Sequence, residues 1–70
     1  MRSREVSRRL RELGRQLVRQ VGSHERWDSR SGHCHCTVPV HAGRAIPRGT
    51  LGNIERSMEH CLGRGWLLGR

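Results

Sequence analysis

Apolar positions near the N-terminus recur with the period of a helix. Residues at i, i+4 and i+7 are apolar: Val6, Leu10 and Leu13. Gly14 follows as a stop signal. The pattern predicts an amphipathic helix over residues 3–13, ending at this glycine. Its opposite face carries four arginines: Arg4, Arg8, Arg11 and Arg15.

Alternation of polar and apolar positions replaces the helical period in the middle of the chain. It predicts three strands, over residues 16–21, 24–28 and 33–38. Gly22-Ser23 between the first two is typical of a two-residue hairpin turn. A second turn is predicted over residues 29–32, and Pro39 is expected to end the third strand.

The same alternation assigns side chains to the two faces of the sheet. In the second strand Trp27 and Glu25 share one face, so that His24, Arg26 and Asp28 share the other. If the large apolar Trp27 packs inward, His24 and Arg26 face solvent together. The first strand is predicted to place Leu17, Arg19 and Val21 on one face and Val18 on the other. The third is predicted to place Cys34, Cys36 and Val38 on one face and His33, His35 and Thr37 on the other.

The helical period returns after a loop over residues 40–49. Thr50 is expected to cap a second helix, with Gly63 after it. Its apolar stripe follows i, i+3, i+7 and i+10: Leu51, Ile54, Met58 and Cys61. The order α-β-β-β-α predicts an α+β fold, a three-stranded antiparallel meander with both helices on its apolar face. We expect a single domain over residues 1–61 and a short C-terminal tail over residues 62–70.

Size and charge restrict the kinds of function that this chain can have. Seventy residues can bury only a small core, so a surface site for a large, extended substrate is favoured over a deep cavity. Fourteen basic residues, all arginine, against six acidic ones give a net charge of +8. Arginine binds phosphate through bidentate hydrogen bonds. A polyanionic partner is therefore predicted: nucleic acid, an acidic protein or an anionic membrane surface.

The number of cysteines indicates whether the protein lies in an oxidising or a reducing compartment. The chain has three: Cys34, Cys36 and Cys61. Their odd number and the absence of a signal peptide or membrane span favour a reduced, cytoplasmic chain without a membrane partner. Cys34 and Cys36 share one face of a strand and are expected to be small core residues that do not bond each other. As an alternative, both could bind zinc together with His60 and Cys61. We expect neither a metal site nor a cofactor.

His24 is the candidate for chemistry, because it follows directly on the predicted hairpin turn. An imidazole at such a position is firmly held and still reaches solvent. Its ordinary pKa of about 6.5 lets it give or take a proton near neutrality. A solvated turn residue without a role is the alternative interpretation.

Three motifs, in this order along the chain, resemble the HicA family of toxins. They are Gly22-Ser23-His24, Thr37-Val38-Pro39 and Pro47-Arg48-Gly49-Thr50-Leu51, and the similarity extends over about residues 4–60. The resemblance implies a fold like that of the double-stranded-RNA-binding domain. It also implies mRNA cleavage as the toxin of a toxin–antitoxin pair, with His24 catalytic and a HicB antitoxin as partner.

Cleavage of RNA by a single histidine is chemically reasonable. RNA carries its own nucleophile, the 2′-hydroxyl, so that a general base can start cleavage without a metal. His24 can act as this base or as the acid for the leaving 5′-oxygen, and His41 is the nearest candidate for the complementary role. Arginines are expected to hold the phosphates: Arg19, Arg26, Arg44 and Arg48. Two rival interpretations are a basic RNA-binding module without catalysis and a zinc-held interaction domain.

Overall fold

Two helices and a three-stranded antiparallel sheet form the computed structural model, which describes residues 1–29, 32–41 and 43–69. Strand order in the sheet follows the chain, β1-β2-β3, and both pairings are antiparallel. The predicted α-β-β-β-α meander is therefore confirmed. The turn expected over residues 29–32 includes residues 30 and 31, which lie outside the described residues. The elements are α1 (Ser3–Glu12), β1 (Gln16–Val21), β2 (His24–Asp28), β3 (His35–Pro39) and α2 (Arg48–Leu62).

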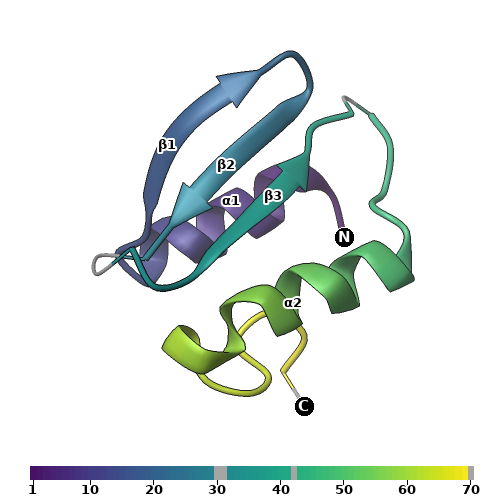
Figure 1. Cartoon of the computed structure of the whole chain (residues 1–70). Coiled ribbons are helices and arrows are strands. Elements are labelled where there is room, and N and C mark those ends of the chain that lie inside the picture. Colours follow the sequence, from purple (N-terminus) through teal and green to yellow (C-terminus); the bar gives the residue numbers. More distant parts are fainter. Residues whose placement is uncertain (30–31, 42, 70) are drawn as a thin grey trace.

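The core lies between the helices and one face of the sheet (Figure 1). Trp27 of β2 is 1% exposed, and it joins the apolar stripes of both helices in one buried cluster. Trp27 thus packs inward, as the alternation predicted. The other members of the cluster are Val6, Leu10, Cys34, Cys36, Val38, Ile46, Leu51, Ile54, Met58, Trp66 and Leu67.

A bulge in β1 makes the predicted faces of this strand wrong. Leu17 lies opposite Trp27, but Arg19 lies opposite Arg26, so that Val18 is the extra residue. Residues opposite each other in neighbouring strands share a face. Leu17 therefore belongs to the core side, whereas Arg19 and Val21 belong to the opposite side.

Other predicted boundaries also shift, and α1 ends at Glu12 rather than at residue 13. β3 begins at His35 rather than residue 33 and includes Pro39, whose missing N–H is tolerated because β3 is an edge strand. α2 begins at Arg48 with Pro47 as N-cap, so that Thr50 is a helical residue instead of the cap. The proline φ of −57° suits a helix start, and the Pro47 carbonyl accepts the N–H of Leu51 (3.0 Å).

Backbone pairing ties the N-terminus to the loop before α2. Arg2 and Ala45 form an isolated antiparallel bridge, and the Ile46 N–H donates to the Met1 carbonyl at 2.8 Å. This contact fixes the backbone of Ala45 and Ile46, directly before α2.

The C-terminal tail folds back under α2 (Figure 1) and is held by the buried Glu55. The Glu55 Oε2 atom accepts the N–H groups of Leu67 (3.2 Å) and Leu68 (2.7 Å). Trp66 donates its indole N–H to the Glu55 carbonyl (2.8 Å), and its own carbonyl accepts Nε of Arg9 (2.8 Å). The tail thereby adds Trp66 and Leu67 to the core.

A disulfide joins Cys34 to Cys61 across 27 residues, with 6.3 Å between the Cα atoms. The expectation of a fully reduced chain is wrong for this pair. Cys34 and Cys36 do not bond each other, as predicted, because the end of α2 brings Cys61 over Cys34 instead. Cys36 is a free, buried thiol.

Candidate nucleic-acid interface and active site

His24 stands directly after the tight β1–β2 turn and is exposed to solvent. Gly22 has a φ of +57°, whereas Ser23 has a negative φ, the combination that a type II′ hairpin turn requires. The Ser23 carbonyl accepts the N–H of Val40 (2.6 Å). His24 is thus held between two paired strands, opposite Val21 on one side and Pro39 on the other.

The neighbour of His24 on the core side anchors β2 to α1. One carboxylate oxygen of Glu25, Oε1, accepts the hydroxyl of Ser7 (2.8 Å) and the indole N–H of Trp27 (3.0 Å). Ser7 itself is 5% exposed. These bonds fix the backbone next to His24, so that the imidazole projects from a rigid support.

The sheet face opposite the helices carries polar side chains from all three strands. Pairing arranges them in three rows across the strands, because opposed residues share a face. The first row is Val21, His24 and Pro39; the second is Arg19, Arg26 and Thr37; the third is Gln16, Asp28 and His35. We call this surface the outer face. Adjacent rows are about 7 Å apart along a strand.

Arg19 and Arg26 lie directly opposite each other in the row next to His24. Like charges so placed destabilise a sheet unless an anion lies between them. Asp28 offsets part of the charge of Arg26, at 3.7 Å from its Nε atom. Among the described residues no ion pair involves Arg19. The structure therefore brings three of the predicted residues, His24, Arg19 and Arg26, to one face.

Arg44 and Arg48 lie elsewhere, in the loop and at the start of α2. Both are exposed, and Figure 1 shows this loop and helix start at the same end of the molecule as the β1–β2 turn. The structure does not place them on the outer face.

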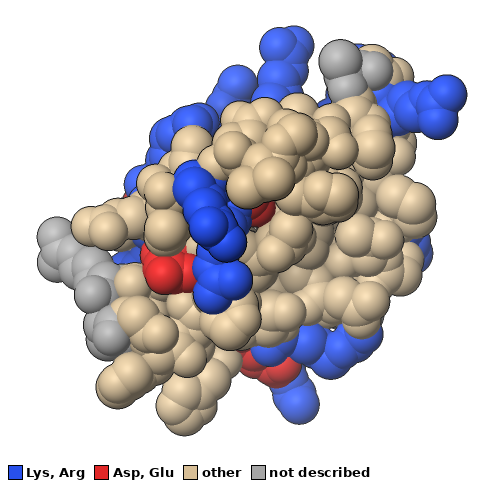
Figure 2. Space-filling view, turned by 45° about the horizontal axis from the view of Figure 1, so that its top comes forward, with Lys and Arg blue, Asp and Glu red and all other residues tan. Residues whose placement is uncertain are grey.

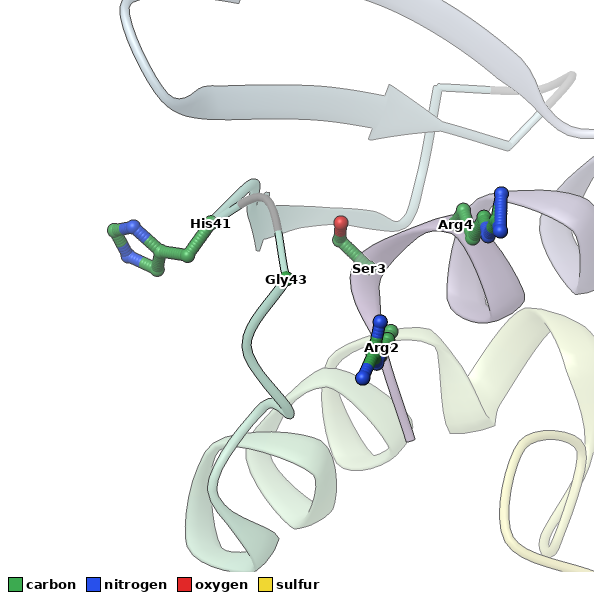
Figure 3. A pocket seen from close by; sticks show the side chains of 5 residues that line it. All are labelled: Arg2, Ser3, Arg4, His41 and Gly43. Atoms are coloured by element: carbon green, nitrogen blue, oxygen red, sulfur yellow. The ribbon is translucent and has the colours of Figure 1, made fainter.

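His41 follows the residue that bonds to the hairpin turn, but no hydrogen bond joins it to His24. Val40, the residue before it, bonds to Ser23, which keeps the chain near the turn. The His41 imidazole projects away from the helix in Figure 3, at the edge of a hollow of about 300 Å³ that α1 and the loop enclose. In the described part of the chain, no hydrogen bond or ion pair links His24 to a second titratable side chain.

The zinc alternative does not fit the structure. Two of its four proposed ligands, Cys34 and Cys61, are bonded to each other. Within residues 1–29, 32–41 and 43–69, no group of three or more His, Cys, Asp or Glu side chains converges on one point.

A polar groove between β3 and α2 was not predicted from the sequence. Thr50, Asn53 and Ser57 line it from α2, and His35 and Thr37 line it from β3. The helical spacing i, i+3, i+7 of the three α2 residues was a signal for a polar stripe. The sequence alone did not show that this stripe lies beside β3, because that depends on how α2 packs.

On the face that Figure 2 shows, basic side chains lie in several places rather than in one patch. Figure 2 shows arginine side chains along the upper rim and at the lower edge, around a broad area of uncharged side chains. Further basic side chains lie left of the centre of this view, with acidic side chains beside them. A long anionic chain can therefore meet arginines at several points of its path.

The chain matches one family model, described as the HicA toxin of bacterial toxin–antitoxin systems, over residues 3–60. No curated protein and no solved structure gives a significant match. No helix among the described residues is long and apolar enough to cross a membrane. The match covers most of the 70 residues, including every helix and strand up to residue 60. The chain belongs to the HicA family and is a toxin of a toxin–antitoxin system, a family membership that implies a cognate antitoxin as partner.

Proposed function

We propose that this toxin is an endoribonuclease that cleaves mRNA with His24 as its acid–base residue, and that a HicB-like antitoxin inhibits it by covering this residue. The observation that supports the proposal most directly is the second row of the outer face. Arg19 and Arg26 are opposed there, one row from the exposed His24. A phosphodiester between the two guanidinium groups relieves their repulsion and lies within reach of the imidazole.

The chemistry needs few groups. His24 removes the proton of the 2′-hydroxyl, and the resulting oxyanion attacks the adjacent phosphorus. The bond to the 5′-oxygen breaks as that oxygen takes a proton from water, which leaves a 2′,3′-cyclic phosphate and a 5′-hydroxyl. Arg19 and Arg26 stabilise the charge on the phosphoryl oxygens. General acid–base catalysis of this kind contributes a factor on the order of 10²–10⁴. With a single histidine the expected turnover is slow, which suffices for growth arrest.

The surroundings of His24 also suit a protein inhibitor. Val21, in the same row, is 63% exposed, more than any other large apolar side chain in the described part of the chain. The net charge of +8 favours an antitoxin with an acidic interface. An acidic surface with an apolar centre would contact Val21 and cover His24 together.

The experiment compares wild type with His24→Ala on labelled mRNA in EDTA, with cleavage and binding scored separately. His60→Ala is the matched control, because it removes an exposed imidazole from α2, away from the outer face. We expect cleavage by wild type and by the control, and none by His24→Ala. Binding of RNA and antitoxin, and the thermal unfolding midpoint, should change little because His24 makes no buried contact.

Other outcomes decide against parts of the proposal. Binding by all three proteins without cleavage by any would indicate a basic RNA-binding module. No second titratable partner of His24 lies among the residues that the structure describes, which makes this the main rival. Unfolding of His24→Ala would mean that the residue is structural.

A further inference from the structure

The groove between β3 and α2 differs chemically from the rest of the basic surface. It has a volume of about 290 Å³, near the lower end of the range for small-molecule sites. Its lining residues include no arginine or carboxylate: His35, Cys36, Thr37, Thr50, Asn53, Ile54 and Ser57. Apart from the imidazole of His35, such a lining offers hydrogen bonds from neutral groups rather than a fixed charge for phosphate.

Side-chain contacts orient the polar groups of α2 in this groove. Arg56 donates to Oδ1 of Asn53, which leaves the Nδ2 group of the amide as its donor. The Ser57 hydroxyl donates to the Asn53 carbonyl (2.8 Å), so that its oxygen can accept a further hydrogen bond. The helix thus presents one fixed donor and one fixed acceptor on the same stripe.

The free edge of β3 adds backbone groups to the same groove. In an antiparallel pair, alternate residues bond to the neighbouring strand. Ser29 bonds to the Cys34 carbonyl (3.0 Å) and Val40 bonds to Ser23 (2.6 Å), so that the alternation assigns Cys36 and Val38 to the bonds with β2. The N–H and C=O groups of His35 and Thr37 consequently point away from β2, toward α2.

The groove continues directly from the proposed phosphate row. Thr37 lies opposite Arg26, which lies opposite Arg19. From Arg19 to Thr37 the row crosses two strand spacings, about 10 Å. An RNA strand that crosses the sheet along this row therefore brings the nucleotide next to the bound phosphate to the groove.

We propose that the β3–α2 groove binds one nucleobase of the RNA, adjacent to the phosphate held by Arg19 and Arg26, and so gives the toxin a base preference. This inference rests on the proposed ribonuclease function. Asn53 and the β3 edge read donors and acceptors on the base, while Thr37 lies between base and phosphate. Single-stranded RNA is recognised by such contacts to the edges of unpaired bases.

The test measures the Kd values of four 2′-O-methyl oligonucleotides, one for each base, which cannot be cleaved through the 2′-oxygen. Wild type is compared with Thr37→Val/Asn53→Ala, which removes a hydroxyl and an amide from exposed positions. Gln16→Ala is the control, because it removes an exposed amide at the opposite edge of the same sheet. We expect wild type to prefer one base. The double variant should bind that oligonucleotide at least about fivefold more weakly, the value of one hydrogen bond, with little change for the least preferred one.

Each other result overturns the groove assignment in a recognisable way. If the double variant bound all four oligonucleotides with wild-type affinity, the groove would be excluded as the base-binding site. The same holds if Gln16→Ala altered the base preference equally. Neither result would contradict the ribonuclease proposal. An equal loss for all four oligonucleotides would indicate a backbone contact instead of a base. Equal wild-type affinity for all four bases would likewise exclude a base site. If wild type bound none of them, the groove and the proposed function would both fall.

Discussion

At the scale of a single residue, the buried thiol of Cys36 makes the free energy of unfolding depend on pH in the alkaline range. Burial, and secondarily the negative charge of Asp28, raise the pKa of the Cys36 thiol from 9.0 to about 12. Between these values the unfolded chain releases a proton that the folded chain keeps, so that the free energy of unfolding falls as the pH rises. The expected loss reaches about 1.4 kcal/mol per pH unit. Urea unfolding at pH values from 8 to 11 measures it.

Hardly any other side chain of this protein titrates in the same pH range, so that the change in the free energy of unfolding can be assigned to Cys36. The chain has no lysine or tyrosine, arginine keeps its proton in this range, and Cys34 and Cys61 are bonded. Cys36→Ala should therefore give a nearly flat profile between pH 9 and 11. A decline of equal slope in this variant would show that another process, such as loss of the disulfide, causes it.

Individual residues were predictable from the sequence where the alternation was unambiguous. Trp27 fixed the inner face of β2, and this in turn placed His24 and Arg26 together on the outer face. In β1 the adjacent apolar residues Leu17 and Val18 fit either face. The bulge that decides between them depends on pairing with β2, which is a contact between strands rather than a local preference.

At the scale of elements, the disulfide connects the start of β3 to the end of α2. A cross-link over 27 residues removes conformational freedom from the unfolded chain and contributes about 3.5 kcal/mol. Reduction should lower the free energy of unfolding by about this amount, measured by urea unfolding with and without dithiothreitol at pH 7.

Two variants identify the source of any effect of the reductant. Cys34→Ser/Cys61→Ser should be as unstable as the reduced wild type and insensitive to dithiothreitol. Cys36→Ala should keep the full difference between the oxidised and reduced states. If wild type unfolds at the same urea concentration in both states, the cross-link does not contribute to stability.

The elements themselves followed from local patterns, but their ends and connections did not. The start of α2 depends on Pro47 and on a loop that Arg2 and Met1 hold in place from the other end of the chain. Threonine is a favoured N-cap residue, but α2 begins at Arg48, two residues before Thr50. The tail could not be placed either, because its main anchor is the buried carboxylate of Glu55, which looks from the sequence like an ordinary surface residue of α2.

At the scale of the whole molecule, the net charge of +8 predicts RNA affinity that falls with salt, whichever surface is used. The location of the contacts requires a comparison of variants with equal total charge. For single strands, each neutralised phosphate contributes about −0.7 to the slope of log K against log salt concentration. If the outer face holds one phosphate between these two arginines, Arg19→Gln/Arg26→Gln should make this slope shallower by about 0.7.

The control for this salt dependence is Arg8→Gln/Arg64→Gln, which lowers the net charge equally at exposed positions of α1 and the tail. Fluorescence anisotropy of a labelled 2′-O-methyl oligonucleotide, at salt concentrations from 50 to about 300 mM, gives the slope for each protein. A control slope close to that of wild type would assign the phosphate contacts to the outer face beside His24. Equal changes in both double variants would mean that RNA responds to the total charge of the molecule, and the case for His24 as the cleaving residue would lose its geometric support.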